Sequence, residues 1–389
     1  MSNFWAMMPL GAVADRVERP ETPLPGKVYR QIGVRLWGEG AYEREPIDGS
    51  QTRYKTLCRV QADDIVVNKI WARNGSVAVV PKVLAGCYGS NEFPSFAPIR
   101  EKLEPRWVHW LTKTKGFWDQ CDEKSRGTSG KNRIRPEKFL EVQIPLPPLP
   151  EQRRIVARID ELAAKIEEAR GLRQQAAGEA AALLAGASAK LFSPGAGWRT
   201  MAVGDFCEPP QYGFTESATE DPVGPRFLRI TDIQDGRVDW KSVPYCHCPD
   251  PRKYLLKSGD LVFARTGATT GKSFVIRDCP EAVFASYLIR LQVRDTVSVE
   301  YLYHYFQSPG YWEQIADEKK GTGQPNLNGS KLERLKIPVA PESEQHRIVA
   351  ELDSLQTRVD TLKQLQVGTA AELDAMLPSI LDTALTGGL

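Results

Sequence analysis

Several short segments of the sequence hold residue types that could bind or activate a substrate. GATTGKS (267–273) resembles a phosphate-binding loop, in which backbone N–H groups and a lysine hold a nucleotide. That loop needs four residues before its Gly-Lys-Ser end, whereas only three separate Gly267 from Gly271. The segment SFVIRD that follows has a strand pattern, not that of a helix whose N-terminus would face a phosphate. Nucleotide binding is therefore not expected there.

The other candidate motifs also lack the context that their chemistry needs. WGEGAY (37–42) lacks the strand–loop–helix order of a cofactor-binding turn. EPPQY (208–212) resembles the catalytic loop of amino-methyltransferases, but its Glu and Gln stand at the wrong places. Cys246 and Cys248 flank a histidine, yet zinc ligands are usually spaced by two to four residues and come with a second pair. We expect no metal site and no catalytic residue.

A comparison of the sequence with itself reveals two copies of one unit. GFWDQCDEKSRGT (116–128) matches GYWEQIADEKKGT (310–322), 194 residues further on. IPLPPLPEQRRIVARID (144–160) matches IPVAPESEQHRIVAELD (337–353), 193 residues further on. DIVVNKIWARNGS (64–76) matches DLVFARTGATTGKS from residue 260 less closely. Because the offset hardly changes along the chain, the sequence predicts a tandem repeat.

Each copy consists of a globular part and a long helix. The globular parts, 1–150 and 198–341, mix short β-branched runs with Gly, Pro and Asn, which indicates strands and hairpins. Short helices are expected at 105–113 and 299–307. The sequence therefore predicts a mixed α+β fold with two pseudo-symmetric α/β domains. The remaining predicted segments are a helix at 151–192, a linker at 193–197 and a helix at 342–389.

The two long helices carry apolar residues at heptad spacing. Pro150 and Pro341 precede them, as is typical of a helix start. A heptad stripe predicts a coiled coil, and each helix is the nearest partner for the other, so we expect an antiparallel pair. About forty residues at ~1.5 Å each would give rods of roughly 60 Å with a globular part at either end. The expected seam is Ile155, Ile159, Leu162, Ile166, Ile348, Leu352, Leu355, Val359 and Leu362.

The loops suggest contact with nucleic acid. Segment 113–138 holds eight Lys or Arg and four Asp or Glu, a local charge of +4 in a chain whose net charge is +2. Arg and Lys bind guanine and phosphate, and Asn and Gln bind adenine, so hairpin loops 69–75 and 264–272 offer the same chemistry. The alternative is that they are solvated loops. The candidate DNA contacts are Lys69, Trp71, Arg73, Asn74, Lys131, Asn132, Arg133, Arg265, Thr266, Thr269, Thr270, Lys272, Gln324, Asn326 and Asn328.

Composition narrows the class of protein further. The chain has 389 residues, 41% hydrophobic and 26% charged, which excludes collagen-like, low-complexity and disulfide-scaffold proteins. Seven cysteines are an odd and sparse set that fits a reducing compartment. The apolar run 180–189 is too short to cross a bilayer, and the uncharged first fourteen residues lack the basic start of a signal peptide. We expect a cytoplasmic protein with no membrane partner.

The plan of the chain resembles the specificity (S) subunit of type I restriction-modification enzymes. LPPLPEQRRIVARIDEL (146–162) and APESEQHRIVAELDSL (340–355) are similar to that family's two helix-entry motifs. GWRTMAVGDFCE (197–208) and PRFLRITDIQDGRV (225–238) are similar to the opening of its target-recognition domains. The resemblance covers nearly all of the chain. The differing loops GTSGKNR and GTGQPNLNG leave open whether both copies contact DNA equally.

The resemblance implies a DNA-recognition role without catalysis. Each globular part would read one half of a split double-stranded target, and the helices would set the spacing between the halves. Two S-adenosylmethionine-dependent methyltransferase (M) subunits would dock on the helices, and ATP-driven translocase–nuclease (R) subunits would join them. S-adenosylmethionine, ATP and Mg²⁺ are thus expected in partner subunits and no cofactor in this chain. The residues assigned to partner binding are Glu151, Gln152, Arg153, Glu344, Gln345 and Arg347.

Two alternative functions remain open at this stage. One is an interaction scaffold whose rods bind protein and whose globular parts bind peptide or glycan. The other is an ATP-binding protein that uses residues 267–273. A steep loss of affinity with salt would favour DNA over the scaffold.

Overall fold

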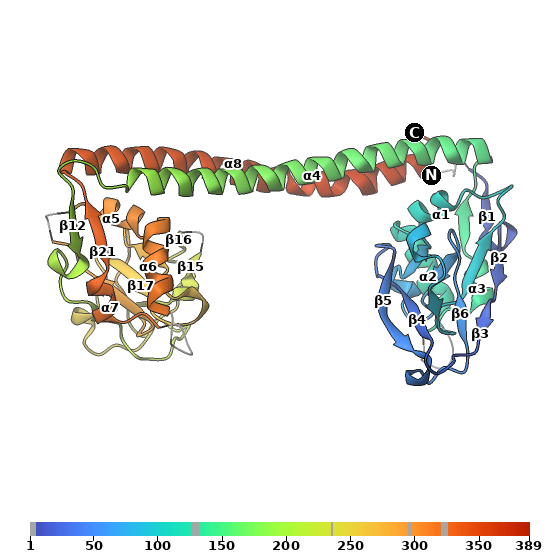
Figure 1. The fold of residues 1–389 in the computed structure, drawn as a ribbon, viewed down its shortest axis with the longest axis horizontal. Helices are drawn as coiled ribbons and strands as arrows, with labels where there is room; N and C mark the ends of the chain where they lie inside the picture. Colours follow the sequence, from blue (N-terminus) through green and yellow to red (C-terminus); the bar gives the residue numbers. More distant parts are fainter. Residues whose placement is uncertain (1–4, 127–131, 235, 295–296, 320–325) are drawn as a thin grey trace. The chain divides into compact units, whose positions relative to one another are not determined.

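The chain divides into two compact units in a computed structural model (Figure 1). The first unit is Met1–Leu172 with Val367–Leu389, and the second is Arg173–Gln366. The division passes through both long helices, so each unit holds a globular part together with one end of each helix. Lys131 and Gln324 lie outside the described part of the chain. The residues that the structure describes are 5–126, 132–234, 236–294, 297–319 and 326–389.

The first globular part contains three β-sheets. A two-stranded sheet joins the start of the chain to the segment before the first long helix, and it consists of β1 (Met7–Pro9) and β11 (Gln143–Pro145). A four-stranded antiparallel sheet follows in the order β2 (Ala14–Val17), β10 (Ser95–Pro98), β7 (Ile65–Val67), β8 (Val77–Val79). The third, of five strands, has the order β3 (Pro20–Glu21), β6 (Leu57–Arg59), β9 (Tyr88–Gly89), β4 (Val28–Val34), β5 (Ala41–Asp48).

The second globular part repeats the first two of these sheets. Its two-stranded sheet is β12 (Arg199–Ala202) with β21 (Lys336–Val339). Its four-stranded sheet has the order β13 (Gln211–Tyr212), β20 (Leu288–Leu291), β17 (Leu261–Ala264), β18 (Ser273–Val275). The same strand order in both units confirms the predicted repeat. The remaining strands are the parallel pair β14 (Arg226–Leu228) and β19 (Ala282–Phe284), and the hairpin β15 (Ile233–Gln234) and β16 (Arg237–Val238).

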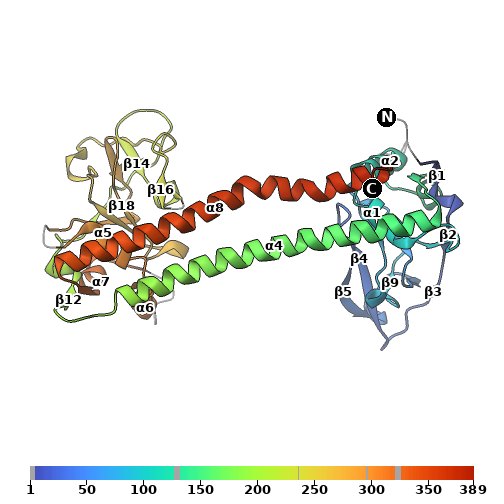
Figure 2. The same ribbon diagram turned by 90° about the horizontal axis from the view of Figure 1, so that it is seen from above.

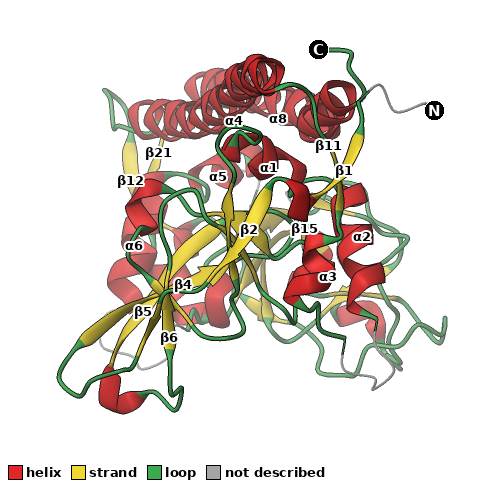
Figure 3. Cartoon of the chain, turned by 90° about the vertical axis from the view of Figure 1, so that its right-hand side faces the viewer, coloured by secondary structure: helices red, strands yellow, loops and turns green. Residues whose placement is uncertain are grey.

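Short helices pack against the sheets and complete a mixed α and β fold (Figure 3). The two predicted short helices are confirmed, as α1 (Pro105–Leu111) and α5 (Val299–Tyr305). A proline at its first turn starts α1, and the Ser298 side chain caps the N-terminus of α5. The other short helices are α2 (Lys115–Ser125), α3 (Pro136–Leu140), α6 (Pro309–Lys319) and α7 (Gly329–Arg334).

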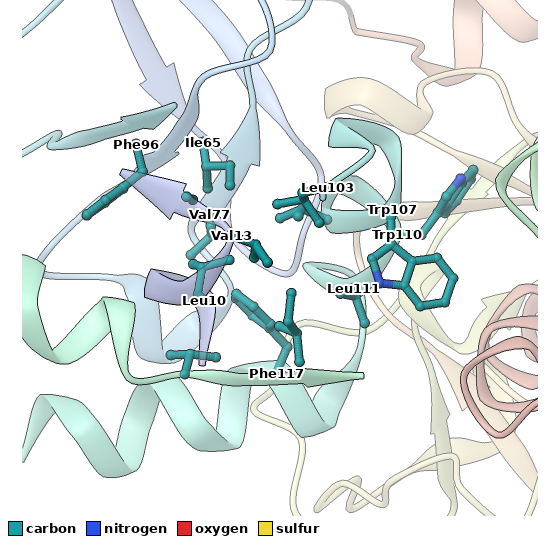
Figure 4. Packing of buried hydrophobic residues seen from close by; sticks show 14 of the residues in the cluster. Leu10, Val13, Ile65, Val77, Phe96, Leu103, Trp107, Trp110, Leu111 and Phe117 are labelled. Carbon is teal, nitrogen blue, oxygen red and sulfur yellow. The ribbon is translucent and has the colours of Figure 1, made fainter. Parts of the chain in front are cut away.

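The larger of two apolar clusters in the described residues of the first unit joins the globular part to the long helices. It combines Leu10, Ile65 from β7 and Val77 from β8 with Trp107 from α1 and Phe117 from α2 (Figure 4). The beginning of the first long helix and the end of the second contribute to the same core. The second unit has a matching cluster to which both long helices also contribute. Each globular part is therefore fused to its helix ends by burial of apolar surface.

The long helices are α4 (Leu149–Leu191) and α8 (Glu342–Leu385), and they run antiparallel within each unit (Figure 2). In the first unit the Arg170 guanidinium lies 2.8 Å from the Asp374 carboxylate. In the second unit the Gln366 side chain donates to the Arg173 carbonyl at 3.1 Å. The predicted antiparallel pairing is confirmed in both units. None of the described helices combines the length and apolarity that a membrane span requires.

The predicted seam is buried most deeply next to the globular parts. Side chains of Ile155, Ile159 and Ile348 are fully buried, and Leu352 is 1% exposed. Ile166 and Val359 are also buried, whereas Leu162, Leu355 and Leu362 are only half-buried. The reason is that Ile155, Ile159, Ile348 and Leu352 lie next to a globular part. Each of these side chains is covered by that part as well as by the other helix.

A glutamine at the start of each long helix is buried in the junction with the globular part. The Gln152 amide accepts a hydrogen bond from the Glu104 backbone at 2.9 Å and donates to the Lys102 carbonyl at 2.9 Å. The Gln345 amide accepts from the Ser298 backbone at 2.9 Å and donates to the Ala340 carbonyl at 2.8 Å.

These contacts correct the sequence analysis, which assigned Gln152 and Gln345 to partner binding. Gln152 is fully buried and Gln345 is 4% exposed, so neither side chain reaches the surface of the described chain. Each glutamine instead forms hydrogen bonds with backbone groups of the loops that lead into a helix. Without the glutamine, these backbone groups would be buried without a partner. Glu151, Arg153, Glu344 and Arg347 lie at the surface or partly buried, and their role in partner binding stays a prediction.

We expect Gln152→Ala to lower the free energy of unfolding of the first unit by about 2–4 kcal/mol, because it leaves buried backbone groups unpaired. The measurement is urea unfolding of the full chain, followed by the fluorescence of its tryptophans. The matched control is Arg153→Ala, whose side chain is 62% exposed. Equal shifts for the two variants would contradict the role of Gln152.

The first unit is also expected to lose stability in mild acid because of His109 on α1. Burial, with help from Lys113 and Arg106, lowers the pKa of His109 from 6.5 to about 4. Between these values the unfolded chain binds a proton that the folded chain does not, so stability falls as the pH drops from 6.5 to 4. The contribution reaches at most about 1.4 kcal/mol per pH unit. Urea unfolding at several pH values should give a flatter profile for His109→Gln, and parallel profiles would contradict this.

Candidate nucleic-acid interface

The loop 69–75 is the tip of the β7–β8 hairpin, as the sequence predicts. It turns through the short 3₁₀ helix Ala72–Asn74 and ends at Gly75, whose φ of 72° favours glycine. A Cβ at Gly75 would lie 2.6 Å from the Trp118 indole nitrogen, so the hairpin packs tightly on α2. At this tip Trp71 is 44% exposed, and the Arg73 guanidinium lies 5.8 Å from its ring centre.

The basic segment after α2 folds back onto this hairpin. The Ile134 backbone donates to the Lys69 carbonyl at 2.9 Å, which places Arg133 beside the tip. Arg133 and Lys69 share the carboxylate of Glu92, at 3.0 and 3.9 Å. The structure thus brings together residues that are more than sixty positions apart in the sequence. Their positive charge is partly neutralised by Glu92 in the free chain.

Loop 264–272 is the tip of the equivalent β17–β18 hairpin. The residues after GATTGKS form β18, so the predicted strand is confirmed and no helix starts there. Tyr311 donates to the Gly271 carbonyl at 2.5 Å and holds the tip against α6. Thr270 is a wrong candidate for DNA contact, because it is 2% exposed and its hydroxyl donates to Gly267 within the loop at 2.7 Å.

The segment 326–329 lies against this second hairpin. Thr266 and Asn326 form a β-bridge, and the Leu327 backbone donates to the Arg265 carbonyl at 2.9 Å. Thr266, Lys272 and Asn326 are exposed. Asn328 is a weaker candidate than the sequence suggested, because its side-chain oxygen caps α7 by accepting from the Lys331 backbone at 2.9 Å.

The sequence analysis missed an open cleft beside this hairpin. Its volume is about 600 Å³, and it is lined by Pro209, Pro210, Gln211, Tyr212, Gly213, Lys253 and Tyr254. The Arg265 guanidinium lies 5.1 Å from the centre of the Tyr212 ring, and the Arg265 Nε has no hydrogen-bond partner within the described residues. In the sequence, the exposed aromatic ring of this cleft corresponds to the tyrosine of EPPQY (208–212). Aromatic faces beside cations suit nucleic acid.

A buried ion pair holds one wall of this cleft in place. Arg290 is 6% exposed and lies 3.1 Å from the Asp260 carboxylate. Its Nη2 nitrogen donates to the Gln211 side chain and, at 3.1 Å, to the Lys253 carbonyl. Gln211 and Lys253, which accept these hydrogen bonds, both line the cleft, so the ion pair fixes their positions.

The two cysteines of the candidate zinc motif lie in the interior of the second unit. Cys246 and Cys248 are buried, and burial raises the pKa of Cys246 to about 11. No group of three or more candidate metal ligands occurs in the part of the chain that the structure describes.

Comparison with known proteins identifies the family. A family model for the type I restriction modification DNA specificity domain matches residues 23–176 and, a second time, residues 196–367. The chain belongs to this family. The two specificity domains correspond to the two copies in the sequence, and the second match begins within the predicted linker.

Curated relatives and solved structures agree with this assignment. The EcoKI specificity subunit of Escherichia coli K12 is 25% identical over 303 residues, 73% of this chain and 65% of that protein. The EcoAI specificity subunit of Escherichia coli is 30% identical over 172 residues, 42% of this chain and 28% of that protein. The matched part therefore spans less than two thirds of either relative.

Two solved structures share the fold of the specificity domains. The HsdS subunit from Thermoanaerobacter tengcongensis is 26% identical, with a TM-score of 0.65, and the match covers 99% of this chain and 97% of that one. A chain from a study of complex assembly and conformational transition of the type I R-M system is 24% identical. Its TM-score is 0.79, and the match covers 100% of this chain and 99% of that one. Type I specificity subunits are DNA-recognition subunits without catalysis of their own.

We expect Arg133→Ala in the first specificity domain and Lys272→Ala in the second each to weaken binding to duplex DNA severalfold. If each side chain contacts one phosphate, each variant should also reduce the slope of log K against log salt by about one. Fluorescence anisotropy of a labelled duplex between about 50 and 200 mM salt measures both effects. The charge-matched control is Lys165→Ala on α4, which removes an exposed lysine paired with Glu161. An equal effect of all three would show that the hairpins have no special role.

Proposed function

We propose that the chain is the specificity subunit of a type I restriction-modification enzyme and recognises a bipartite double-stranded DNA target, one half per specificity domain. The observation that carries the proposal is that both domains have the same hairpin, with different side chains at its tip. The β7–β8 tip presents Lys69, Trp71 and Arg73, whereas the β17–β18 tip presents Thr266 and Lys272. Different donors and acceptors on one scaffold suit two different base sequences.

The long helices are proposed to set the spacing between the two half-targets. Support comes from the continuity of α4, which begins in the first unit and ends in the second, and of α8, which runs in the opposite sense. An unbroken helix transmits length at ~1.5 Å per residue.

The same helices are proposed to dock two methyltransferase subunits, through which translocase–nuclease subunits join. Support comes from an apolar groove of about 180 Å³ between α4 and α8 in the second unit. Leu183 lines it with a side chain that is 62% exposed, so the groove offers apolar surface to a partner. S-adenosylmethionine, ATP and Mg²⁺ would then be bound by those partners. The groove residues are Ala180, Leu183, Leu184, Leu355, Arg358, Val359 and Leu362.

Co-expression with a type I methyltransferase subunit, co-purification and sequencing of the methylated genomic sites test this function. The expected result is a complex that methylates two short defined sequences separated by a spacer of fixed length and undefined sequence. A single continuous motif would contradict the assignment of one half-target to each domain. If the affinity of the chain for DNA did not fall with increasing salt, that result would favour the interaction scaffold instead.

We expect the spacer to lengthen when the helices are lengthened together. Seven residues inserted after Leu172 in α4 and after Gln366 in α8 keep the heptad register and add ~10.5 Å. At ~3.4 Å per base pair this corresponds to a spacer about three base pairs longer. The measurement is sequencing of methylated sites, with insertion in α4 alone as the control that breaks the pairing. An unchanged spacer in the double insertion would contradict the role of the helices.

A further inference from the structure

Two tryptophans of the first specificity domain are exposed in a way that the hairpin fold does not require. The chain has nine tryptophans, and all nine lie in the described residues. Only Trp37 and Trp71 are more than a third exposed within that part, at 51% and 44%. Burying a tryptophan is strongly favourable, so two of them in solvent on one surface indicate a ligand.

Trp37 is held against the β7–β8 hairpin by its backbone. It lies in the turn between β4 and β5, and its N–H donates to the Asn74 carbonyl at 2.7 Å. The next N–H, of Gly38, donates to the Gly75 carbonyl at 3.0 Å, and the Lys113 ammonium donates to the Gly38 carbonyl at 2.9 Å. The turn after β4 and the tip of β7–β8 therefore form one continuous surface.

The backbone of Trp37 is unfavourable for a side chain. Its φ is 57°, in the left-handed region where non-glycine residues are uncommon and bulky ones are strained. A glycine would adopt this conformation without strain. Such strain persists where the surroundings fix the backbone, and it gathers at ligand-binding sites. A tryptophan at this position thus serves something other than the stability of the turn.

The Trp37 ring rests on a neighbouring aromatic ring and is half exposed. It packs edge to face against the Trp118 ring, with 5.4 Å between centroids and 63° between planes. Trp118 is itself fixed, because its indole N–H donates to the Thr112 carbonyl at 2.6 Å. The ring of Trp37 is thereby oriented while half of its surface stays open to a ligand.

The charges around Trp37 favour a polyanion. Arg35 is exposed and lies over the Tyr42 ring at 4.9 Å, and Arg73 lies beside Trp71. Within the described part of the chain neither arginine forms an ion pair, whereas Arg30 on β4 is paired with Glu43. Unpaired arginines around aromatic rings suit phosphates and bases rather than an apolar protein surface.

None of the tryptophans in the described residues of the second specificity domain is exposed. There β14, which pairs in parallel with β19 as β4 does with β9, is followed by the 3₁₀ helix Ile230–Asp232, and Arg229 forms an ion pair with Asp232 at 2.7 Å. We propose that Trp37 is a specificity-determining residue that contacts base edges or sugars in the half-target read by the first domain. This proposal rests on the proposed function, since it assumes that the two domains read separate halves of one DNA target.

The test is selection from a pool of duplexes with a long randomised segment by the purified full-length chain. The wild-type chain should select two separated sequences. Trp37→Ala should lose base preference in one half only, with about tenfold weaker binding to the wild-type consensus. Trp71→Ala should affect the same half. Trp37→Gly, which removes the ring and relieves the strained φ, should bind as weakly as Trp37→Ala without unfolding at a lower temperature.

Tyr54→Ala is the matched control. Tyr54 is 47% exposed in the same unit, but it follows the end of β5 that is remote from the turn. Its consensus and affinity should equal those of the wild type. A consensus in Trp37→Ala that is unchanged in both halves, with affinity within about twofold, would overturn the proposal. Loss of methyltransferase co-purification with unchanged selection would overturn it in favour of a protein contact. A wild-type chain that selects no sequence would instead overturn the proposed function.

Discussion

The burial of one glutamine at the start of each long helix is the constraint on which the organisation of each unit depends. A helix that leaves a globular part exposes unpaired backbone groups at the point where the loop meets it. Gln152 and Gln345 satisfy such groups inside the junction, where water cannot. Each helix end is thereby fixed in direction relative to its own globular part. A domain that positions DNA-reading loops along a helix needs such a fixed joint.

The same logic extends to other polar contacts that recur in both copies. The Gln120 side chain pairs with both backbone groups of Gln143, and the Gln314 side chain pairs in the same way with Lys336. The Trp110 indole donates to Asp160 at 2.9 Å, and His304 takes the corresponding place beside Asp353 at 2.8 Å. What the two copies share is therefore largely internal scaffolding. What differs lies on the exposed hairpins and turns, where a change of side chain alters recognition without cost to the fold.

The difference between shared and divergent positions also explains the errors in the sequence analysis. Gln152 and Gln345 stand in a strongly repeated motif, and repetition alone does not say whether a polar residue faces a partner or a buried backbone. Thr270 and Asn328 have the chemistry of DNA contacts, but local hydrogen bonds within a turn and at a helix start use their polar atoms. Trp37 is not among the predicted contacts, because no spacing in the sequence shows that its turn lies on the hairpin at Asn74.

The sequence by itself determined the repeat, the mixed fold, the two hairpins, two of the short helices and the antiparallel pairing of the long ones. The helices and strands follow from the local spacing of apolar residues. The repeat follows from comparing the sequence with itself, so neither needs a tertiary structure. Only the tertiary structure decided which polar side chains are buried and which loops meet. Glu92 lies between Lys69 and Arg133, and the turn at Trp37 lies on the hairpin at Asn74. Such contacts join residues far apart in the chain, and their partners are fixed by sheet order and core packing rather than by any spacing in the sequence.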